Sequence, residues 1–166
     1  MHLSSSYLET LRALQEEAEA EGKRCCVGAC ILDQQGHLLV QKRAPDRKLF
    51  PNCWDIIGGH VEAGETLTAT LAREIHEETG WGIARIIALL QVWEWEGEPT
   101  GSRREFDFLV EIEGDLEYPQ IEQGKHTAFR WVGLDELEIL KEERLAGGEE
   151  LYQLTKRALE WHIHSI

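Results

Sequence analysis

The sequence has little of what a membrane or secreted protein needs. Nowhere do about eighteen apolar residues run together, and residues Met1 to Ser6 lack the basic and apolar stretches of a secretory signal. We therefore expect a cytoplasmic protein with no membrane partner. Its 166 residues, 42% of them hydrophobic and 29% charged, are typical of one globular domain covering residues 1–166.

Basic residues are also scarce. There are 17 Lys and Arg against 31 Asp and Glu, which gives a formal net charge of -14 at pH 7. Such a charge opposes binding to nucleic acids through a basic surface, so we predict no nucleic-acid partner. The same charge would repel a phosphorylated substrate unless metal cations lie between the substrate and the carboxylates.

The cysteines do not form a metal-binding or disulfide pattern. None of Cys25, Cys26, Cys30 and Cys53 belongs to a Cys-x-x-Cys pair, and the first three fall in one expected strand. Buried free thiols are therefore the favoured state, and a zinc site is the weaker alternative.

Hydrophobic periodicity and turn residues predict the order of the elements. Helices are expected within residues 1–22, 66–80 and 149–162, with a short helical segment at 135–140. Strands are expected at residues 24–32, 38–43, 54–57, 83–95, 105–112 and 128–132, the first two forming a hairpin. Thr66 is the expected N-cap of the central helix, and Gly80 or Gly82 is its expected stop.

Three carboxylates gather on that central helix. Glu74, Glu77 and Glu78 stand at positions i, i+3 and i+4, so they project from one side of the helix. Like charges placed in this way repel unless a cation sits between them, and Mg2+ is the hard divalent ion that best suits carboxylates, water and phosphate oxygens. The alternative is an ordinary solvated acidic face, which is common in so acidic a chain.

The residues around the helix favour the metal site over a solvated face. Gly58 and Gly59 precede the loop that leads into the helix, and paired glycines let the backbone approach an ion or a phosphate closely. Arg73 lies where it can hold the carboxylate of Glu65 through a charge-assisted hydrogen bond.

These residues together resemble the signature of the Nudix hydrolase family. Every place of that signature is filled, by Gly59, Glu65, Arg73, Glu74, Ile75, Glu77, Glu78, Gly80 and Trp81. The similarity extends over most of residues 25–140. It implies an α/β fold, a Nudix-type α/β/α sandwich with a mixed central β-sheet, and a metal-dependent pyrophosphohydrolase.

The resemblance also implies roles for the site residues. Glu74, Glu77 and Glu78, with the backbone carbonyl of Gly58, would bind Mg2+, for which Mn2+ can substitute. Glu65 and Arg73 would orient this cluster. The proton of the attacking water would go either to a signature glutamate, Glu77 or Glu74, or to one from a later loop, for which Glu122 is the candidate.

Residues outside the signature are candidates for substrate binding. Arg43 and one of Arg103 and Arg104 could bind phosphate groups, with the plain surface role as the alternative. Strict alternation over residues 92–96 places Trp93 and Trp95 on one face of a strand, where an exposed indole could stack on a nucleobase. The alternative for these indoles is packing beneath the N-terminal helix or at a dimer contact. His60 and His76 occupy variable places of the signature, so we expect both to be surface residues.

The resemblance leaves the substrate open among nucleoside diphosphate derivatives: nucleoside triphosphates, ADP-ribose and other nucleotide sugars. A homodimer is a candidate assembly, because dimers are common in the family. An isopentenyl-diphosphate isomerase-like enzyme is one alternative, although that branch needs a cysteine near the place of Gly58. A Nudix module that binds a ligand without catalysis is another, although such modules normally lose signature carboxylates that this chain keeps.

Overall fold

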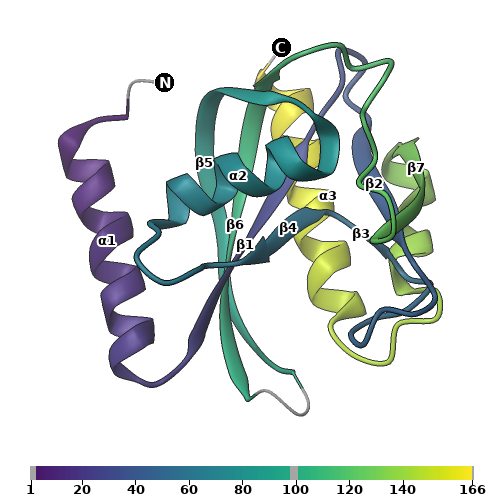
Figure 1. The fold of residues 1–166 in the computed structure, drawn as a ribbon. Coiled ribbons are helices and arrows are strands. Elements are labelled where there is room, and N and C mark those ends of the chain that lie inside the picture. The colour runs from purple at the N-terminus through teal and green to yellow at the C-terminus, as the bar shows by residue number, and fades with distance from the viewer. Residues whose placement is uncertain (1–2, 98–100, 166) are drawn as a thin grey trace.

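The computed structural model describes residues 3–97 and 101–165. Figure 1 shows the elements in chain order: α1 (Ser5–Ala20), β1 (Arg24–Ile31), β2 (Leu38–Arg43), β3 (Trp54–Asp55), β4 (Ile57–His60), α2 (Leu67–Thr79), β5 (Gly82–Glu96), β6 (Ser102–Glu113), β7 (His126–Val132), the 3-10 helix η1 (Leu134–Lys141) and α3 (Gly148–Ser165). The expected helix within residues 1–22 is therefore α1, and residues 1 and 2 lie outside the described part. The expected helix at 149–162 is the longer α3.

The central sheet is mixed and lies between helices. Its strand order is β4-β1-β6-β5, with β1 parallel to β6 and the other pairs antiparallel. Leu11 of α1 and Leu71 of α2 pack in one core with Phe106 of β6, whereas Leu154 of α3 packs in another core with Leu109 of the same strand. Because successive side chains of a strand point to opposite faces, α1 and α2 cover one face and α3 covers the other. The predicted α/β/α sandwich is confirmed.

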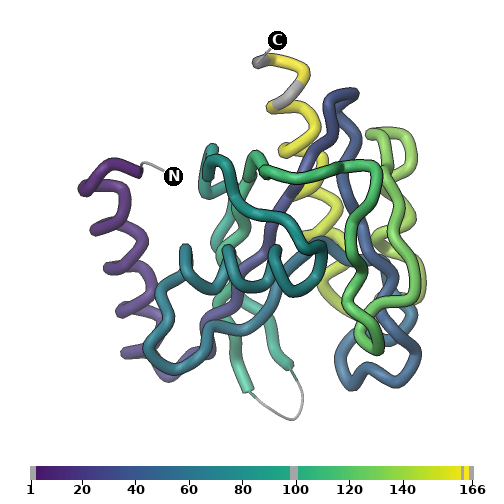
Figure 2. The backbone as a smooth tube through the Cα atoms, turned by 45° about the horizontal axis from the view of Figure 1, so that its top comes forward, coloured from purple at the N-terminus to yellow at the C-terminus, as the bar shows by residue number. Residues whose placement is uncertain are grey.

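A second, antiparallel sheet with the order β3-β2-β7 stands beside the first, and Figure 2 shows it on the opposite side of the molecule from α1. The predicted hairpin of residues 24–32 and 38–43 is therefore wrong. These two strands belong to different sheets and meet only at the bridge between Leu32 and Leu38. The reason is that β6 pairs along one edge of β1 and β4 pairs with residues 26–29 along the other, so β2 cannot continue along β1 beyond the bridge.

Local signals set the limits of α2. The Thr66 hydroxyl accepts a hydrogen bond from the Ala69 amide at 3.2 Å, and Gly80 ends the helix in the left-handed region at φ 77°. Leu71 and Ile75 are fully buried against the central sheet. Glu74 and Glu78, each three residues after Leu71 or Ile75, are buried along the same side of α2, which also packs against β4.

The four cysteines are free thiols with buried side chains, as expected. Within residues 3–97 and 101–165, no helix has both the length and the apolar character that crossing a bilayer requires.

Candidate active site

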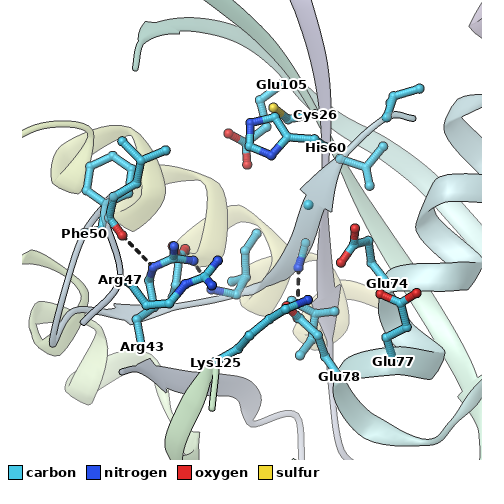
Figure 3. A pocket seen from close by; sticks show the side chains of 18 of the residues that line it. Cys26, Arg43, Arg47, Phe50, His60, Glu74, Glu77, Glu78, Glu105 and Lys125 are labelled. Atoms are coloured by element: carbon cyan, nitrogen blue, oxygen red, sulfur yellow. Dashed lines mark hydrogen bonds between the residues drawn. The ribbon is translucent and has the colours of Figure 1, made fainter. Parts of the chain in front are cut away.

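A cavity of about 800 Å³ opens between α2, the central sheet and the segment that follows β2. Figure 3 shows Glu74, Glu77 and Glu78 together on one side of it, with Arg43, Arg47 and Phe50 across from them. His60, Cys26 and Glu105 form a third side. Acidic, basic and aromatic groups therefore meet in one space.

Two of the three clustered carboxylates are buried. Glu74 and Glu78 expose 7% and 4% of their surface, whereas Glu77 is exposed. Burial raises the pKa of Glu74, although hydrogen bonding to Arg73 acts in the opposite direction. Burial and the charge of Glu74 together raise the pKa of Glu78 well above its ordinary value. The sequence expectation that all three share one side of α2 is met, but their environments differ.

Glu78 has weak polar partners for a buried carboxylate. Its Oε2 accepts hydrogen bonds from the Gln41 side-chain amide and from the Gly58 backbone amide, each at 3.2 Å. Its Oε1 lies 3.9 Å from Nε2 of His126. The pKa of His126 is lowered to about 4 by burial, so this imidazole is neutral near pH 7 and does not balance the charge.

The predicted loop residue Glu122 comes to the same place. Ligand atoms of Glu78, Glu122 and His126 all lie within 4.8 Å of one another, and the buried Oε2 of Glu122 has no hydrogen-bond partner in the part of the chain that the structure describes. The other oxygen of Glu122 pairs with Lys125 Nζ at 2.8 Å. Buried carboxylate oxygens that face one another without donors suit a divalent cation, so the residues fit the Mg2+ expected from the sequence.

Glycine is required beside these carboxylates. A Cβ on Gly59 would lie 2.1 Å from Oε1 of Glu74, and a Cβ on Gly58 would lie 2.3 Å from the carbonyl oxygen of Val27. The backbone of β4 therefore approaches Glu74 and β1 more closely than any other residue allows. The same crowding leaves no room at residue 58 for the cysteine of the isomerase-like alternative.

Arg73 ties the loop before α2 to the acidic cluster. Its guanidinium contacts both oxygens of Glu65, and hydrogen bonding to it lowers the pKa of Glu65 to about 2. It also donates to Oε1 of Glu74 at 2.7 Å, to Oε2 of Glu77 at 3.3 Å and to the His60 carbonyl at 3.0 Å. The expected pairing of Arg73 with Glu65 is present, and Arg73 reaches the proposed metal ligands as well.

The structure places the predicted substrate-binding residues differently. Arg43 lines the cavity, and its Nε donates to the Leu49 carbonyl at 3.0 Å. Arg104 lies outside the cavity, on the α1 side of β6, where it contacts Glu94 and Glu21, each at 2.7 Å. Arg103 points the other way but is 1% exposed and donates to His60 Nε2 at 3.0 Å. The alternation of side chains along β6 separates the two arginines.

The indoles line the cavity. Trp93 and Trp95 both contribute to its wall, on the face of β5 away from α1, so the alternative of packing beneath that helix is wrong. His60 also lines the cavity and is not the surface residue expected from the sequence, whereas His76 is exposed. Burial, together with the charges of Arg24 and Arg103, lowers the pKa of His60 to about 4, so its imidazole is neutral near pH 7.

Several cavity residues carry no sequence signal that identifies them. Arg144 is buried, pairs with Asp55 at 2.9 Å and lies 4.5 Å from the centre of the Phe50 ring. Glu105 lines the cavity and accepts a hydrogen bond from the Trp95 indole, whereas Asp107 is fully buried behind the wall and accepts one from the Trp93 indole. Alternation along residues 105–112 puts Glu105 and Asp107 on one face, but nothing in the sequence says which face meets the cavity.

Known proteins share this fold. The sequence profile of the NUDIX domain matches residues 22–154. A MutT protein from Methanosarcina mazei Go1 is similar in structure, with a TM-score of 0.65 and 21% identity over 84% of this chain and 95% of that one. A MutT NUDIX hydrolase from Burkholderia pseudomallei has a TM-score of 0.59 and 28% identity, covering 83% of this chain and 96% of that one.

Curated relatives agree with these structures. An RNA pyrophosphohydrolase of Wolbachia pipientis wMel is 29% identical over 129 residues, which are 69% of this chain and 76% of that protein. The m7GpppN-mRNA hydrolase NUDT17 of Xenopus laevis is 36% identical over 88 residues, 51% of this chain, and the match spans 30% of that longer protein. With its complete signature, the chain belongs to the Nudix family and is a MutT-like hydrolase.

Proposed function

We propose that this chain is a Mg2+-dependent pyrophosphohydrolase that cleaves a nucleoside diphosphate linked to another group. One observation carries the proposal: Glu74 and Glu78 are buried at a cavity lined by arginines and indoles, and Oε2 of Glu122, beside Glu78, has no hydrogen-bond partner among the described residues. Buried acids with raised pKa values in a cavity are typical of functional sites, because burial without a partner destabilises the fold.

The acidic residues have different roles in this proposal: metal binding, positioning and proton transfer. Glu74, Glu77 and Glu78, with the carbonyl of Gly58, would hold the metal, and the buried Oε2 of Glu122 beside Glu78 would complete the group of ligands. Arg73 with Glu65 would keep Glu74 in place. When bound, Mg2+ supplies charge neutralisation for the diphosphate and a lowered pKa for a water molecule. We assign the water's proton to Glu77, which lines the cavity, in preference to Glu122, which does not and is paired with Lys125.

The opposite side of the cavity binds the rest of the substrate in this proposal. Arg43 and Arg47 line it and offer donors to phosphate oxygens, and Lys125 lines the cavity on the side of Glu78. The local group of cations matters because the whole chain carries a formal charge of -14. Cations facing the cavity lower the repulsion that a phosphorylated ligand would meet elsewhere on the surface.

A substrate panel tests the proposal. Nucleoside triphosphates, ADP-ribose and nucleotide sugars would be incubated with the protein and Mg2+, with phosphate release as the readout. RNA with a 5′-triphosphate or a cap belongs in the panel, because the names of two relatives describe action on RNA. We expect turnover of at least one small nucleotide, and low activity on RNA because of the chain's acidity.

Two variants control that panel. Glu77→Gln should lower kcat by about 100-fold or more, as is typical for loss of an acid-base group. Glu111 is an exposed glutamate of β6 that pairs with Arg85 of β5, so Glu111→Gln should keep wild-type rates. Wild-type rates in Glu77→Gln would overturn its assigned role, and ligand binding without turnover of any panel member would favour the non-catalytic module.

A further inference from the structure

The central sheet presents a row of polar and aromatic side chains to the cavity. In register across the strands lie His60 of β4, Cys26 of β1, Glu105 of β6 and Trp93 of β5. Residues paired in this way project from the same face of a sheet, and all four line the cavity. Figure 3 shows Glu105 beside His60 and Cys26, on a different side of the cavity from the α2 glutamates.

The Glu105 carboxylate accepts two hydrogen bonds, which fix its position. The Trp95 indole donates to its Oε2 at 2.6 Å, and the carboxyl of Asp107 is hydrogen-bonded to it. Burial raises the pKa of Glu105 to about 7 and that of Asp107 well above its ordinary value, and the charge of Glu105 raises the pKa of Asp107 further. Asp107 therefore keeps its proton over the pH range in which Glu105 loses its own, and Glu105 is the charged acceptor above about pH 7.

The next row of the sheet supports this arrangement. Asp107 is 0% exposed and accepts a hydrogen bond from the Trp93 indole at 2.9 Å. Gly28 makes room for it, since a Cβ there would lie 2.1 Å from Oδ1 of Asp107. The buried Oδ1 has no partner in the described residues. Burying two acids side by side destabilises a fold, so the pair calls for a functional explanation.

Aromatic rings frame the exposed part of Glu105. The rings of Trp93 and Trp95 are stacked with centroids 6.4 Å apart, and the Phe50 ring lies 5.6 Å from that of Trp95. The guanidinium of Arg144 covers Phe50. A flat base that stacks on these rings would bring its edge to the Glu105 carboxylate.

We propose that this wall is the base subsite of the substrate, and that Glu105 selects a guanine-type base by accepting hydrogen bonds from its ring N–H and its exocyclic amino group. A carboxylate only accepts, so it matches two adjacent donors. Adenine instead presents an acceptor beside its amino group and would repel the charge. The inference rests on the proposed hydrolase function, because it places the base of the substrate at this wall and the phosphates of the same substrate at the α2 glutamates.

Steady-state kinetics on the wild-type protein test the subsite first. Guanosine, inosine and adenosine 5′-triphosphates are compared, because inosine keeps the ring N–H but lacks the amino group. We expect KM to be about 10-fold higher for inosine than for guanosine, and higher still for adenosine, with kcat little changed. Equal KM values for the three nucleotides would overturn the inference.

Glu105→Gln then tests the residue. The amide replaces an acceptor with a donor, so we expect the KM for inosine 5′-triphosphate divided by that for guanosine 5′-triphosphate to fall from about ten to about one, while kcat stays within about threefold. Glu111→Gln on the same strand should keep the wild-type ratio. A mere packing defect would raise all three KM values equally, and this result would count against the inference.

Binding separates this inference from the proposed function. Quenching of indole fluorescence by GDP, compared with IDP and ADP, needs no turnover. Guanine-selective quenching that disappears in Glu105→Gln would support the subsite even if no nucleotide is hydrolysed. Hydrolysis without any base preference in kinetics or quenching would support the proposed hydrolase function and refute the guanine subsite.

Discussion

Arg73 holds both carboxylate oxygens of Glu65, with Nε 2.8 Å from Oε1 and Nη2 3.0 Å from Oε2. The same guanidinium reaches Glu74 on its own helix. Only a planar guanidinium, with several N–H donors, can donate hydrogen bonds to both carboxylates at the same time. The loop before α2 and the acidic face of α2 are thereby joined through one side chain.

Replacing Arg73 by lysine should therefore lower activity without unfolding the protein. Lysine keeps the charge but cannot bond both oxygens of Glu65 while also reaching Glu74. We expect kcat to fall by about 10- to 100-fold, the loss typical of a charged hydrogen bond of about 1.5 to 3 kcal/mol. The matched control is Arg12→Lys, which alters an exposed pair with Glu16 on α1. Equal rates in the two variants would contradict the positioning role.

Gly59→Ala should damage the site through a single methyl group. The added Cβ would meet the Glu74 carboxylate at 2.1 Å and force it aside. A displacement of about 1 Å in a catalytic group can lower the rate about 100-fold. Gly82→Ala is the control, because there the nearest atom, the Glu113 carbonyl oxygen, is 4.0 Å away. Wild-type kinetics for Gly59→Ala would show that Glu74 has room to move.

The stability of the metal-free protein should depend on Glu78. A carboxyl whose pKa is raised on folding stabilises the fold below its ordinary value of 4.5, and this contribution is lost as pH rises through the folded pKa. We expect Glu78→Gln to be more stable than wild type in chelator, with a difference that grows above pH 4.5. Urea unfolding at several pH values measures this difference.

Added Mg2+ should reverse that order of stability. An ion that binds only the folded state stabilises it by about 2.7 kcal/mol at 100 times its dissociation constant. The wild type should gain this stabilisation and Glu78→Gln should gain much less. Glu111→Gln serves as the control, since its carboxylate lies at the surface with Arg85. An identical response of wild type and Glu78→Gln would remove Glu78 from the metal site.

Arg43→Ala should weaken substrate binding, whereas Arg104→Ala should leave it unchanged. Arg43 lines the cavity, so its removal should raise KM by about 10-fold through loss of a charged contact. Arg104 lies with Glu21 and Glu94 on the other face of β6, so its removal should leave KM unchanged and cost about 0.2 to 1 kcal/mol of stability. A raised KM in Arg104→Ala would show that its ion pairs open to reach the substrate.

Much of the site is predictable because its signals are local. The Thr66 cap, the Gly80 stop and the spacing of Glu74, Glu77 and Glu78 all act within one helix, and the structure shows them there. The pairing of Arg73 with Glu65 spans eight residues, a separation that the turn into α2 bridges. Helical periodicity converts such short spacings into positions in space without reference to the rest of the chain.

Errors arise where the partner of a strand is distant in sequence. β1 and β2 follow one another, yet β1 pairs with β6, whose residues lie far along the chain. The same parallel register decides that Glu105 faces the cavity and that Arg104 does not. Alternation alone separates these two neighbours, but it does not say which of them points inward.

The sequence by itself determined the acidic helix, its caps, the glycine pair and the family, because each depends on contacts between residues close along the chain. Only the tertiary structure decided that Trp93, Trp95 and Glu105 share a wall opposite that helix, and that Glu122 comes beside Glu78. Those positions depend on strand register and on the path of long loops. Both are fixed by burial across the whole core, which no short segment encodes.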